Sequence, residues 1–248
     1  MGPTPSPEIA KQIRKNFSSV RFYQDIFLIR HHLWKDVRQV ASQFKGRLID
    51  VGCGLKPYAS LFPGVDYLGL DYPPGSDRHY GEHTLADAWG DASALPFPSE
   101  TFDSALSIHV LEHLPAPESH VQEMFRVLKP GGRILLSAPF VWPVHGEPWD
   151  FVRYTPQGLV RLLENAGFQV ETVKAQGGAW SAAGQMVIIA LLFGALRPRP
   201  PWDRPLGWLW KLSLVPLINV AALVLDKIFQ EDRWALSFLA VARKNGGN

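Results

Sequence analysis

A short apolar segment that runs directly into two glycines constrains the fold of this 248-residue chain more than any other feature. The segment is Leu48–Val51, and the glycines are Gly52 and Gly54. Its apolar and β-branched residues are typical of a parallel strand that is covered on both faces. Glycine lets the backbone turn sharply and approach a ligand with no side chain in the way. The sequence therefore predicts a small-molecule site at the carboxyl end of a first strand, where open α/β sheets bind their ligands.

The glycine loop does not match the pattern of a dinucleotide site. That pattern, G-x-G-x-x-G, requires a third glycine, and this chain has Pro57 in its place. Proline lacks the amide hydrogen that a pyrophosphate would bind. An acid, Asp50, precedes the first glycine. An acid-G-x-G loop fits a ligand with a cationic amino-acid group better than it fits a diphosphate.

A second short strand, Tyr67–Asp71, also ends in an acid. Asp71 follows the glycine turn by about 20 residues, the spacing at which open α/β sheets place a ribose ligand. A carboxylate there can accept hydrogen bonds from two adjacent hydroxyl groups. Asp71 is therefore predicted to bind a ribose, and the neighbouring Tyr72 is predicted to pack on an adenine ring.

Four more segments follow in order: Gly90–Pro98, Phe102–Ser107, Val110–Leu114 and Val127–Leu136. With the glycine loop and Asp71, this succession resembles the class I S-adenosylmethionine-dependent methyltransferases, in particular the small-molecule branch that includes quinone and sugar methylases. The resemblance covers residues 45–175 and the last strand, and departs from the family at Lys56, where a third glycine is usual. It implies S-adenosylmethionine as cofactor and a Rossmann-like α/β fold. That fold has a seven-stranded, mostly parallel sheet with an antiparallel last strand, an N-terminal helical lid and a helical insertion before the last strand.

The resemblance also implies roles for single residues. Asp50 would organise the glycine loop or meet the methionine ammonium group. Asp91 would accept a hydrogen bond from the adenine amino group, with Asp87 as its rival, and the Ala92 amide would meet a ring nitrogen. Cys53 is expected to be a small filler rather than a nucleophile. The expected cofactor-binding residues are Asp50, Gly52, Cys53, Gly54, Asp71, Tyr72, Asp91, Ala92 and Ile108.

Methyl transfer from a sulfonium is an in-line displacement, so the enzyme has mainly to aim a nucleophile at an activated methyl group. If the acceptor is a hydroxyl, a base must take its proton, and histidine is the usual choice near neutral pH. Residues 139–154 are dense in aromatic, charged and proline residues and contain His145, a composition typical of a binding pocket. His145 is the predicted base. The alternative base is His109, which ends the fourth strand beneath the sulfonium. A mechanism without a dedicated base stays open. The predicted substrate-binding residues are Trp142, Trp149, Asp150, Arg153 and Tyr154.

Two residues of the Val110–Leu114 segment are expected to be structural, with Glu112 as the cap of the helix that follows and His113 as a hydrogen-bonded core residue. The resemblance implies that Asp150 and Arg153 pair with each other. No metal site is predicted, because the single cysteine excludes a cysteine-rich zinc site.

Hydrophobic periodicity divides the chain into four regions. Residues 1–44 are expected to form two helices, at 7–20 and 22–44, that cover the cofactor as a lid. The methyltransferase core follows at 45–178, an apolar helical cap at 179–235, and the last strand at 236–244. In the core we expect strands at 48–52, 66–70, 102–108, 133–138 and 168–175, a loop between the strands at 66–70 and 102–108, and helices at 57–62 and 118–128. A further helix opens at Thr155–Pro156 and ends at Gly167, and the seventh strand covers 237–242.

Composition limits the partners and the compartment. The net charge is +2 with both signs interspersed, which argues against nucleic acid as a partner. Residues 1–20 lack the apolar run of a signal peptide, and there is a single cysteine, so we expect a cytoplasmic protein.

The region before the last strand is unusually apolar. Ala182–Leu196 has no charged residue, and Leu206–Leu225 has only Lys211. The first stretch is too short for a membrane span, and polar residues and a proline interrupt the second. Residues 180–230 are therefore expected as a buried cap, a homodimer face or a peripheral membrane-docking surface rich in tryptophan and arginine.

The sequence thus predicts an enzyme that transfers a methyl group from S-adenosylmethionine to a small molecule, with oxygen as the favoured acceptor atom. A hydrophobic or lipid-linked acceptor would account for the apolar insertion. The alternatives are a hydroxylated secondary metabolite as acceptor, a non-catalytic scaffold with the same fold and, least favoured, a nucleotide-binding oxidoreductase.

Overall fold

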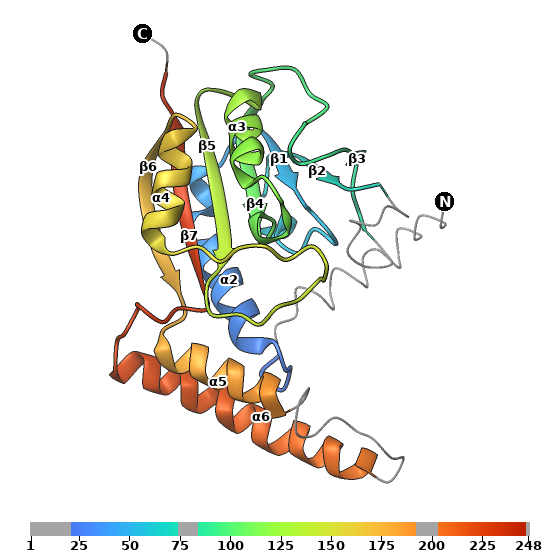
Figure 1. Ribbon diagram of the computed structural model, residues 1–248, viewed down its shortest axis with the longest axis vertical. Helices are drawn as coiled ribbons and strands as arrows, with labels where there is room; N and C mark the ends of the chain where they lie inside the picture. Colours follow the sequence, from blue (N-terminus) through green and yellow to red (C-terminus); the bar gives the residue numbers. More distant parts are fainter. Residues whose placement is uncertain (1–20, 74–83, 192–202, 247–248) are drawn as a thin grey trace.

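The computed structural model describes residues 21–73, 84–191 and 203–246, with side chains in the last range from Leu212 onward. The predicted helix at 7–20 lies outside the described residues. The described chain forms a sheet flanked by helices (Figure 1). The strands are β1 (Arg47–Val51), β2 (Asp66–Asp71), β3 (Ala88–Trp89), β4 (Phe102–Ile108), β5 (Leu128–Pro139), β6 (Phe168–Gln176) and β7 (Ser237–Lys244). The α-helices are α2 (Phe27–Val40), α3 (Pro117–Val127), α4 (Pro156–Asn165), α5 (Ala179–Ile189) and α6 (Asp203–Ile228).

The sheet has the strand order β3-β2-β1-β4-β5-β7-β6. The pairs from β3 through β5 are parallel, and β7 is antiparallel to both of its neighbours. The predicted Rossmann-like methyltransferase fold, with a mostly parallel sheet of seven strands and an antiparallel last strand, is confirmed.

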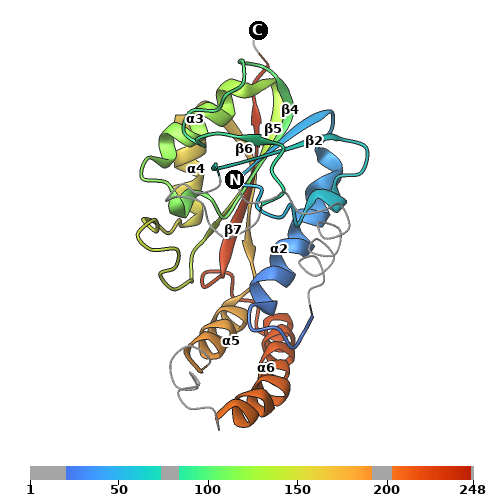
Figure 2. The same cartoon turned by 90° about the vertical axis from the view of Figure 1, so that its right-hand side faces the viewer.

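Helices cover both faces of the sheet (Figure 2). α3 and α4 lie on one face and share the largest core cluster with β1, β4 and β5. On the other face α2 places Val37 against Leu135 and Leu239. The first half of α2 packs instead on the α5–α6 pair, where Leu28 and Leu33 meet Ala222. α2 is therefore a layer of the fold, and the rest of the predicted lid, residues 1–20, lies outside the described residues.

Four local predictions differ from the structure. The helix expected at 57–62 is only a 3₁₀ turn, Ala59–Leu61, because Pro63 and Gly64 follow at once and stop it. The strand expected at 133–138 begins five residues earlier, at Leu128, and absorbs the Pro-Gly-Gly sequence as a bulge in which Gly131 has a φ of +80°. β3 falls in a segment that was expected to be a loop. The helix predicted between 22 and 44 is shorter and covers Phe27–Val40, followed by a 3₁₀ turn.

The insertion between β6 and β7 is a helical hairpin of α5 and α6 that projects from one end of the sheet (Figure 1). The Asp226 carboxylate of α6 accepts hydrogen bonds from the backbone amides of Gly178, Trp180 and Ser181 at the start of α5. This caps α5 and fixes one helix against the other. None of the helices in the described ranges combines the length and the apolar composition of a bilayer span.

The strand register places several segments at one edge of the sheet. Pro139 at the end of β5 and Gln176 at the end of β6 both pair with Ser237. Ile108 at the end of β4 pairs with Ser137. The loop of residues 140–154, the α5–α6 hairpin and the end of β4 therefore meet at the carboxyl edge of the parallel strands, where the ligand site was predicted.

Candidate active site

The glycine loop after β1 has a backbone that only glycine adopts easily. Gly52 and Gly54 have φ of +73° and +48°. A Cβ atom at Gly52 would lie 2.4 Å from Cγ2 of Val110, whereas a Cβ at Gly54 would enter open space. The amides of Gly52 and Cys53 donate to the Leu70 carbonyl at 2.9 and 3.1 Å, which holds the loop against β2. The open side of Gly54 is the close approach that the cofactor requires.

Asp71 lies directly beside this loop. Its carboxylate accepts hydrogen bonds from the Gly54 amide at 2.8 Å, the Tyr72 amide at 2.8 Å and the Thr84 hydroxyl at 3.2 Å. A carboxylate has about four acceptor positions, so capacity remains for a ribose hydroxyl. Asp71 therefore joins the glycine loop to the predicted ribose position.

Asp50 is buried and suits a cationic ligand. Burial raises the pKa of its carboxyl to about 7, although a hydrogen bond from the Tyr67 hydroxyl favours the charged form. The nearby Asp71 charge raises the pKa further. A positive charge nearby would lower the pKa of Asp50 again. The ammonium and sulfonium groups of S-adenosylmethionine supply such a charge. The residues around the glycine loop thus fit the cofactor.

Lys56 and Asp87 form a structural ion pair behind the loop. The Lys56 ammonium donates to the Asp87 carboxylate, which also accepts the Gly69 amide hydrogen at 2.8 Å. Lys56 is buried and has a φ of +50°, so it adopts the backbone of the glycine that it replaces. Asp87 is thereby engaged, which leaves Asp91 as the predicted adenine ligand. Cys53 is buried with a raised thiol pKa, as expected of a filler and not of a nucleophile.

Two residues of α3 that we did not predict support the adenine segment. The buried His120 ring bonds to the Ala92 carbonyl at 3.0 Å and to the Ser107 hydroxyl at 2.9 Å. The Glu123 carboxylate accepts the Leu95 amide hydrogen at 2.7 Å. These contacts fix the backbone around Asp91 and Ala92 relative to β4. The sequence shows that His120 and Glu123 lie three residues apart on one helix, but it does not show which groups they bind.

Glu123 should stabilise the fold in a pH-dependent way. Its pKa is lowered, chiefly by hydrogen bonds from Arg126, so its contribution is present above the ordinary pKa of 4.5 and is lost as the pH falls through the folded-state value. We expect Glu123→Gln to lower the free energy of unfolding by about 1–2 kcal/mol at pH 7. In urea unfolding, the difference from wild type should narrow below pH 4.5. Glu118→Gln, at an exposed position of α3, is the control. If Glu123→Gln lowered the free energy of unfolding by the same amount at low pH, the stabilisation could not come from the Glu123–Arg126 ion pair.

The end of β4 carries Ile108 and His109. Ile108 packs between the two clusters that involve α2. His109 has a φ of +55° and is partly buried, and its buried Nε2 atom has no hydrogen-bond partner among the described residues. Burial lowers the pKa of His109 to about 3, with further lowering from the His145 and His113 charges. At neutral pH this imidazole is a weak proton acceptor. Burial lowers the pKa of His145 as well, so the choice of base between the two histidines stays a prediction.

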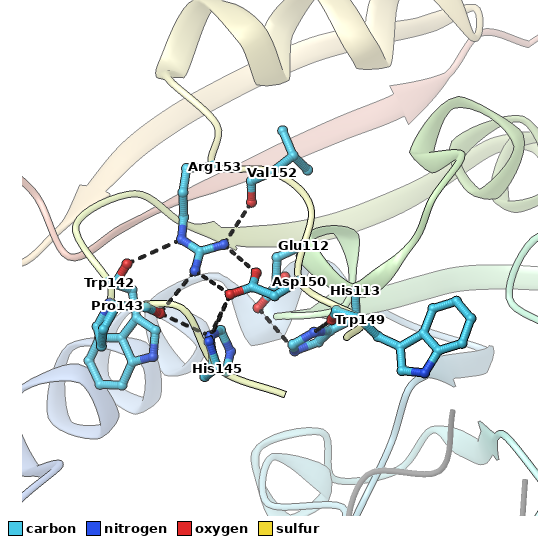
Figure 3. A network of polar contacts seen from close by, with 9 residues as sticks. All are labelled: Glu112, His113, Trp142, Pro143, His145, Trp149, Asp150, Val152 and Arg153. Atoms are coloured by element: carbon cyan, nitrogen blue, oxygen red, sulfur yellow. Dashed lines mark hydrogen bonds and ion pairs between the residues drawn. The ribbon is translucent and has the colours of Figure 1, made fainter. Parts of the chain in front are cut away.

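The loop of residues 140–154, which we call the acceptor loop, is built around an Asp150–Arg153 pair (Figure 3). Two guanidinium nitrogens donate to the two Asp150 oxygens at 2.5 and 2.7 Å, so the implied pairing is confirmed. Arg153 also donates to the carbonyls of Trp142, Pro143 and Val152. The Asp150 side chain is only 2% exposed. These two residues therefore hold the loop together, and the contact of this loop with an acceptor stays a prediction.

His145 is positioned by the same pair. Its backbone amide donates to Asp150 at 2.8 Å, and its Nδ1 lies 3.2 Å from the Pro143 carbonyl and 3.3 Å from an Asp150 oxygen. The ring is packed edge-on to His113, with 4.8 Å between centroids. The acceptor loop thus brings His145 to the residues that follow β4.

Glu112 is not the helix cap that we predicted. Ala116 precedes α3, and no side chain caps that helix. The Glu112 side chain is completely buried, and neither carboxylate oxygen has a hydrogen-bond partner in the described part of the chain. Burial raises the pKa of this carboxyl group to about 8. The side chain points instead toward His113 and His145 (Figure 3).

Comparison with known proteins agrees with the geometry. Residues 49–136 match the family model of a methyltransferase domain. An uncharacterized methyltransferase from Mycolicibacterium paratuberculosis is 33% identical over 193 residues, which cover 69% of this chain and 71% of the relative. One from Mycobacterium marinum is 32% identical over 225 residues, 80% of this chain and 82% of the relative. The crystal structure of an S-adenosylmethionine-dependent methyltransferase from Archaeoglobus fulgidus shares the fold, with a TM-score of 0.53 at 16% identity over 86% of this chain and 93% of that one. The chain belongs to the class I S-adenosylmethionine-dependent methyltransferases.

Proposed function

We propose that this methyltransferase methylates an oxygen atom of a small hydrophobic or lipid-linked acceptor, in the manner of the branch that acts on quinones and sugars, and that it meets the acceptor at a membrane surface. The observation that carries this proposal is an exposed apolar face on the α5–α6 hairpin, at the same edge of the sheet as the acceptor loop.

The exposed face follows one side of α6. Leu217, Val220 and Val224 are between 49% and 64% exposed and recur at helical spacing. Ile228, also exposed, extends the same side toward the C-terminal end of the helix. A contiguous apolar surface of this kind marks an interaction site in a water-exposed protein. An interfacial helix buries such a face at the boundary between headgroups and acyl chains.

The hairpin is fixed to the rest of the enzyme, so its apolar face stays outward. Asn219 donates to the Phe22 carbonyl at 2.7 Å, and Gln185 donates to the Asp25 carbonyl at 2.6 Å. Trp142 of the acceptor loop packs on the cluster that contains Ala182 of α5. An acceptor that arrives along the hairpin would therefore reach the acceptor loop directly.

The reaction at this edge would be a displacement at the sulfonium methyl group. The acceptor O–H bond breaks and a new O–CH₃ bond forms, while the methyl–sulfur bond breaks and its electron pair stays on sulfur. The cofactor supplies the activated methyl group. The chain aims the acceptor oxygen with Trp142, Trp149 and Tyr154 and accepts the proton at the histidine cluster, for which His145 is our proposed base.

Two other interpretations of the apolar face remain as outcomes of a test. A second copy of the chain would cover it in a homodimer, and a polar secondary metabolite as acceptor would leave it without a role in turnover. The basic isoelectric point, about 8.7, favours an anionic membrane over self-association.

We expect tritiated methyl groups from S-adenosylmethionine to enter the organic-extractable fraction of a cell extract, and the protein to float with anionic vesicles. The triple variant Leu217→Glu, Val220→Glu, Val224→Glu should reduce vesicle binding and lipid labelling by at least about tenfold, because each lost apolar side chain forfeits roughly 0.8 kcal/mol per buried CH₂ group. Cofactor affinity, measured by calorimetry, should not change.

The matched control is Gln157→Glu with Arg161→Glu on the exposed side of α4, which also lowers the net charge by three, one from the first change and two from the second. Label confined to the aqueous fraction would identify a polar acceptor and overturn the proposal. A dimer in sedimentation that the triple variant dissociates, with no vesicle binding, would assign the face to a second subunit.

A further inference from the structure

Three side chains with metal-binding atoms converge where the acceptor loop meets the residues after β4. Glu112 and His113 come from the turn that follows β4, and His145 comes from the acceptor loop (Figure 3). One ligand atom from each lies within 4.8 Å of the other two. The cluster joins the sequence motif after β4 to a loop that follows β5.

The Glu112 carboxylate is the unusual member of this group. Its side chain is 0% exposed, and neither oxygen has a hydrogen-bond partner among the residues that the structure describes. Burying a carboxyl group without partners costs several kcal/mol, so such a group normally pairs with a cation or binds a metal. Among the described residues, His113 Nε2 lies 3.9 Å from the Glu112 carboxylate. That distance is too long for a hydrogen bond.

Both histidine rings are oriented in the way that metal ligands are. His113 Nδ1 lies 2.5 Å from the Trp149 carbonyl oxygen, and His145 Nδ1 lies 3.2 Å from the Pro143 carbonyl oxygen. A carbonyl only accepts hydrogen bonds, so each Nδ1 carries the hydrogen and each neutral ring has its lone pair on Nε2. Asp150, 3.3 Å from His145 Nδ1, adds a carboxylate to this support. A backbone carbonyl or carboxylate on the outer nitrogen is the usual arrangement behind a metal-bound histidine.

We propose that Glu112, His113 and His145 bind a divalent transition-metal ion of the zinc type. Two imidazoles and one carboxylate are a donor set that suits zinc and disfavours magnesium, which prefers oxygen ligands. Tetrahedral ligands with bonds of about 2.1 Å lie roughly 3.4 Å apart, so small side-chain movements would close the present site. Three protein ligands leave a coordination position open.

The role of the metal rests on the proposed function, although the binding itself does not. The open position would take the acceptor hydroxyl, and the positive charge would ionise it by sending its proton to water. The resulting oxygen would then attack the methyl group, as described above. In that case His145 acts as a ligand and the metal replaces it as the activating group.

Zinc binding to tag-free, chelator-treated protein tests this directly and needs no acceptor. We expect one zinc ion per chain by calorimetry and elemental analysis. Zinc should also raise the melting temperature by about 5–10 °C at a hundredfold excess over the Kd, whereas magnesium should not. Glu112→Gln and His145→Ala should each weaken zinc binding by at least about 100-fold.

His31→Ala on α2 removes a histidine elsewhere and should leave zinc binding unchanged. Folding of each variant is checked by its affinity for S-adenosylmethionine. Absence of stoichiometric zinc, zinc binding that survives Glu112→Gln and His145→Ala, or tighter binding of magnesium would overturn the metal site. If zinc binds as expected but no lipid acceptor is labelled, only the proposed function fails.

Discussion

Replacing His145 with alanine is expected to reduce methyl transfer by about 10²–10⁴-fold, the usual contribution of a group that handles the acceptor proton. The ring is required whether it takes the proton itself or holds a metal that activates the acceptor. The alanine variant keeps the backbone amide that donates to Asp150 at 2.8 Å, so the acceptor loop should keep its shape. Turnover is measured with labelled cofactor and the extracted acceptor fraction, and cofactor affinity by calorimetry.

The comparison that makes this result specific is His31→Ala, which removes a ring stacked on Phe27 in α2. That variant should retain wild-type turnover. Full turnover in His145→Ala would remove the acceptor loop histidine from the mechanism and direct attention to His109.

Asp71→Ala is expected to weaken S-adenosylmethionine binding by about 10- to 150-fold, equivalent to the 1.5–3 kcal/mol of a lost hydrogen bond to a charged acceptor. Two effects combine in this variant. The ribose loses its carboxylate, and the Gly54 amide loses the acceptor that lies 2.8 Å away. Asp71→Asn keeps one oxygen and should give an intermediate loss.

The control for Asp71 lies at the opposite end of the same strand. The Asp66 side chain is 75% exposed and contacts Arg47. Asp66→Ala should leave the cofactor Kd unchanged. Equal affinity of Asp71→Ala and wild type, with both folded, would refute the ribose assignment.

The cofactor half of the site could be predicted because its requirements are local. Gly52 and Gly54 are needed for a backbone with positive φ, and Asp71 ends a strand that follows at a fixed spacing. The apolar runs and turns gave the places of most strands, whereas the mostly parallel sheet with an antiparallel last strand was implied by the family resemblance. Such information is contained in short stretches of sequence.

The acceptor half could not be predicted to the same depth, since its contacts join distant residues. Glu112 looked like a helix cap until the fold placed His145 beside it. In the cofactor half too, Asp87 was the rival of Asp91 as adenine ligand, and only the fold shows that Lys56, 31 residues away in sequence, engages it. In α6, Leu212 is exposed whereas Val215 is buried, although both belong to one apolar stretch. Composition alone does not say which side of such a helix meets the protein.

The α5–α6 hairpin leaves the sheet at Gln176 and re-enters it at Ser237, and these two residues pair with each other. Its two junctions are therefore a single strand spacing apart, about 5 Å. In topological terms the hairpin is a long loop between adjacent antiparallel strands, and loops of this kind change length at little entropic cost. Descendants of one ancestral chain can thus lengthen, shorten or exchange this segment without altering strand order. The preference for an acceptor and the binding to a membrane surface can then diverge while the cofactor half of the site stays constant.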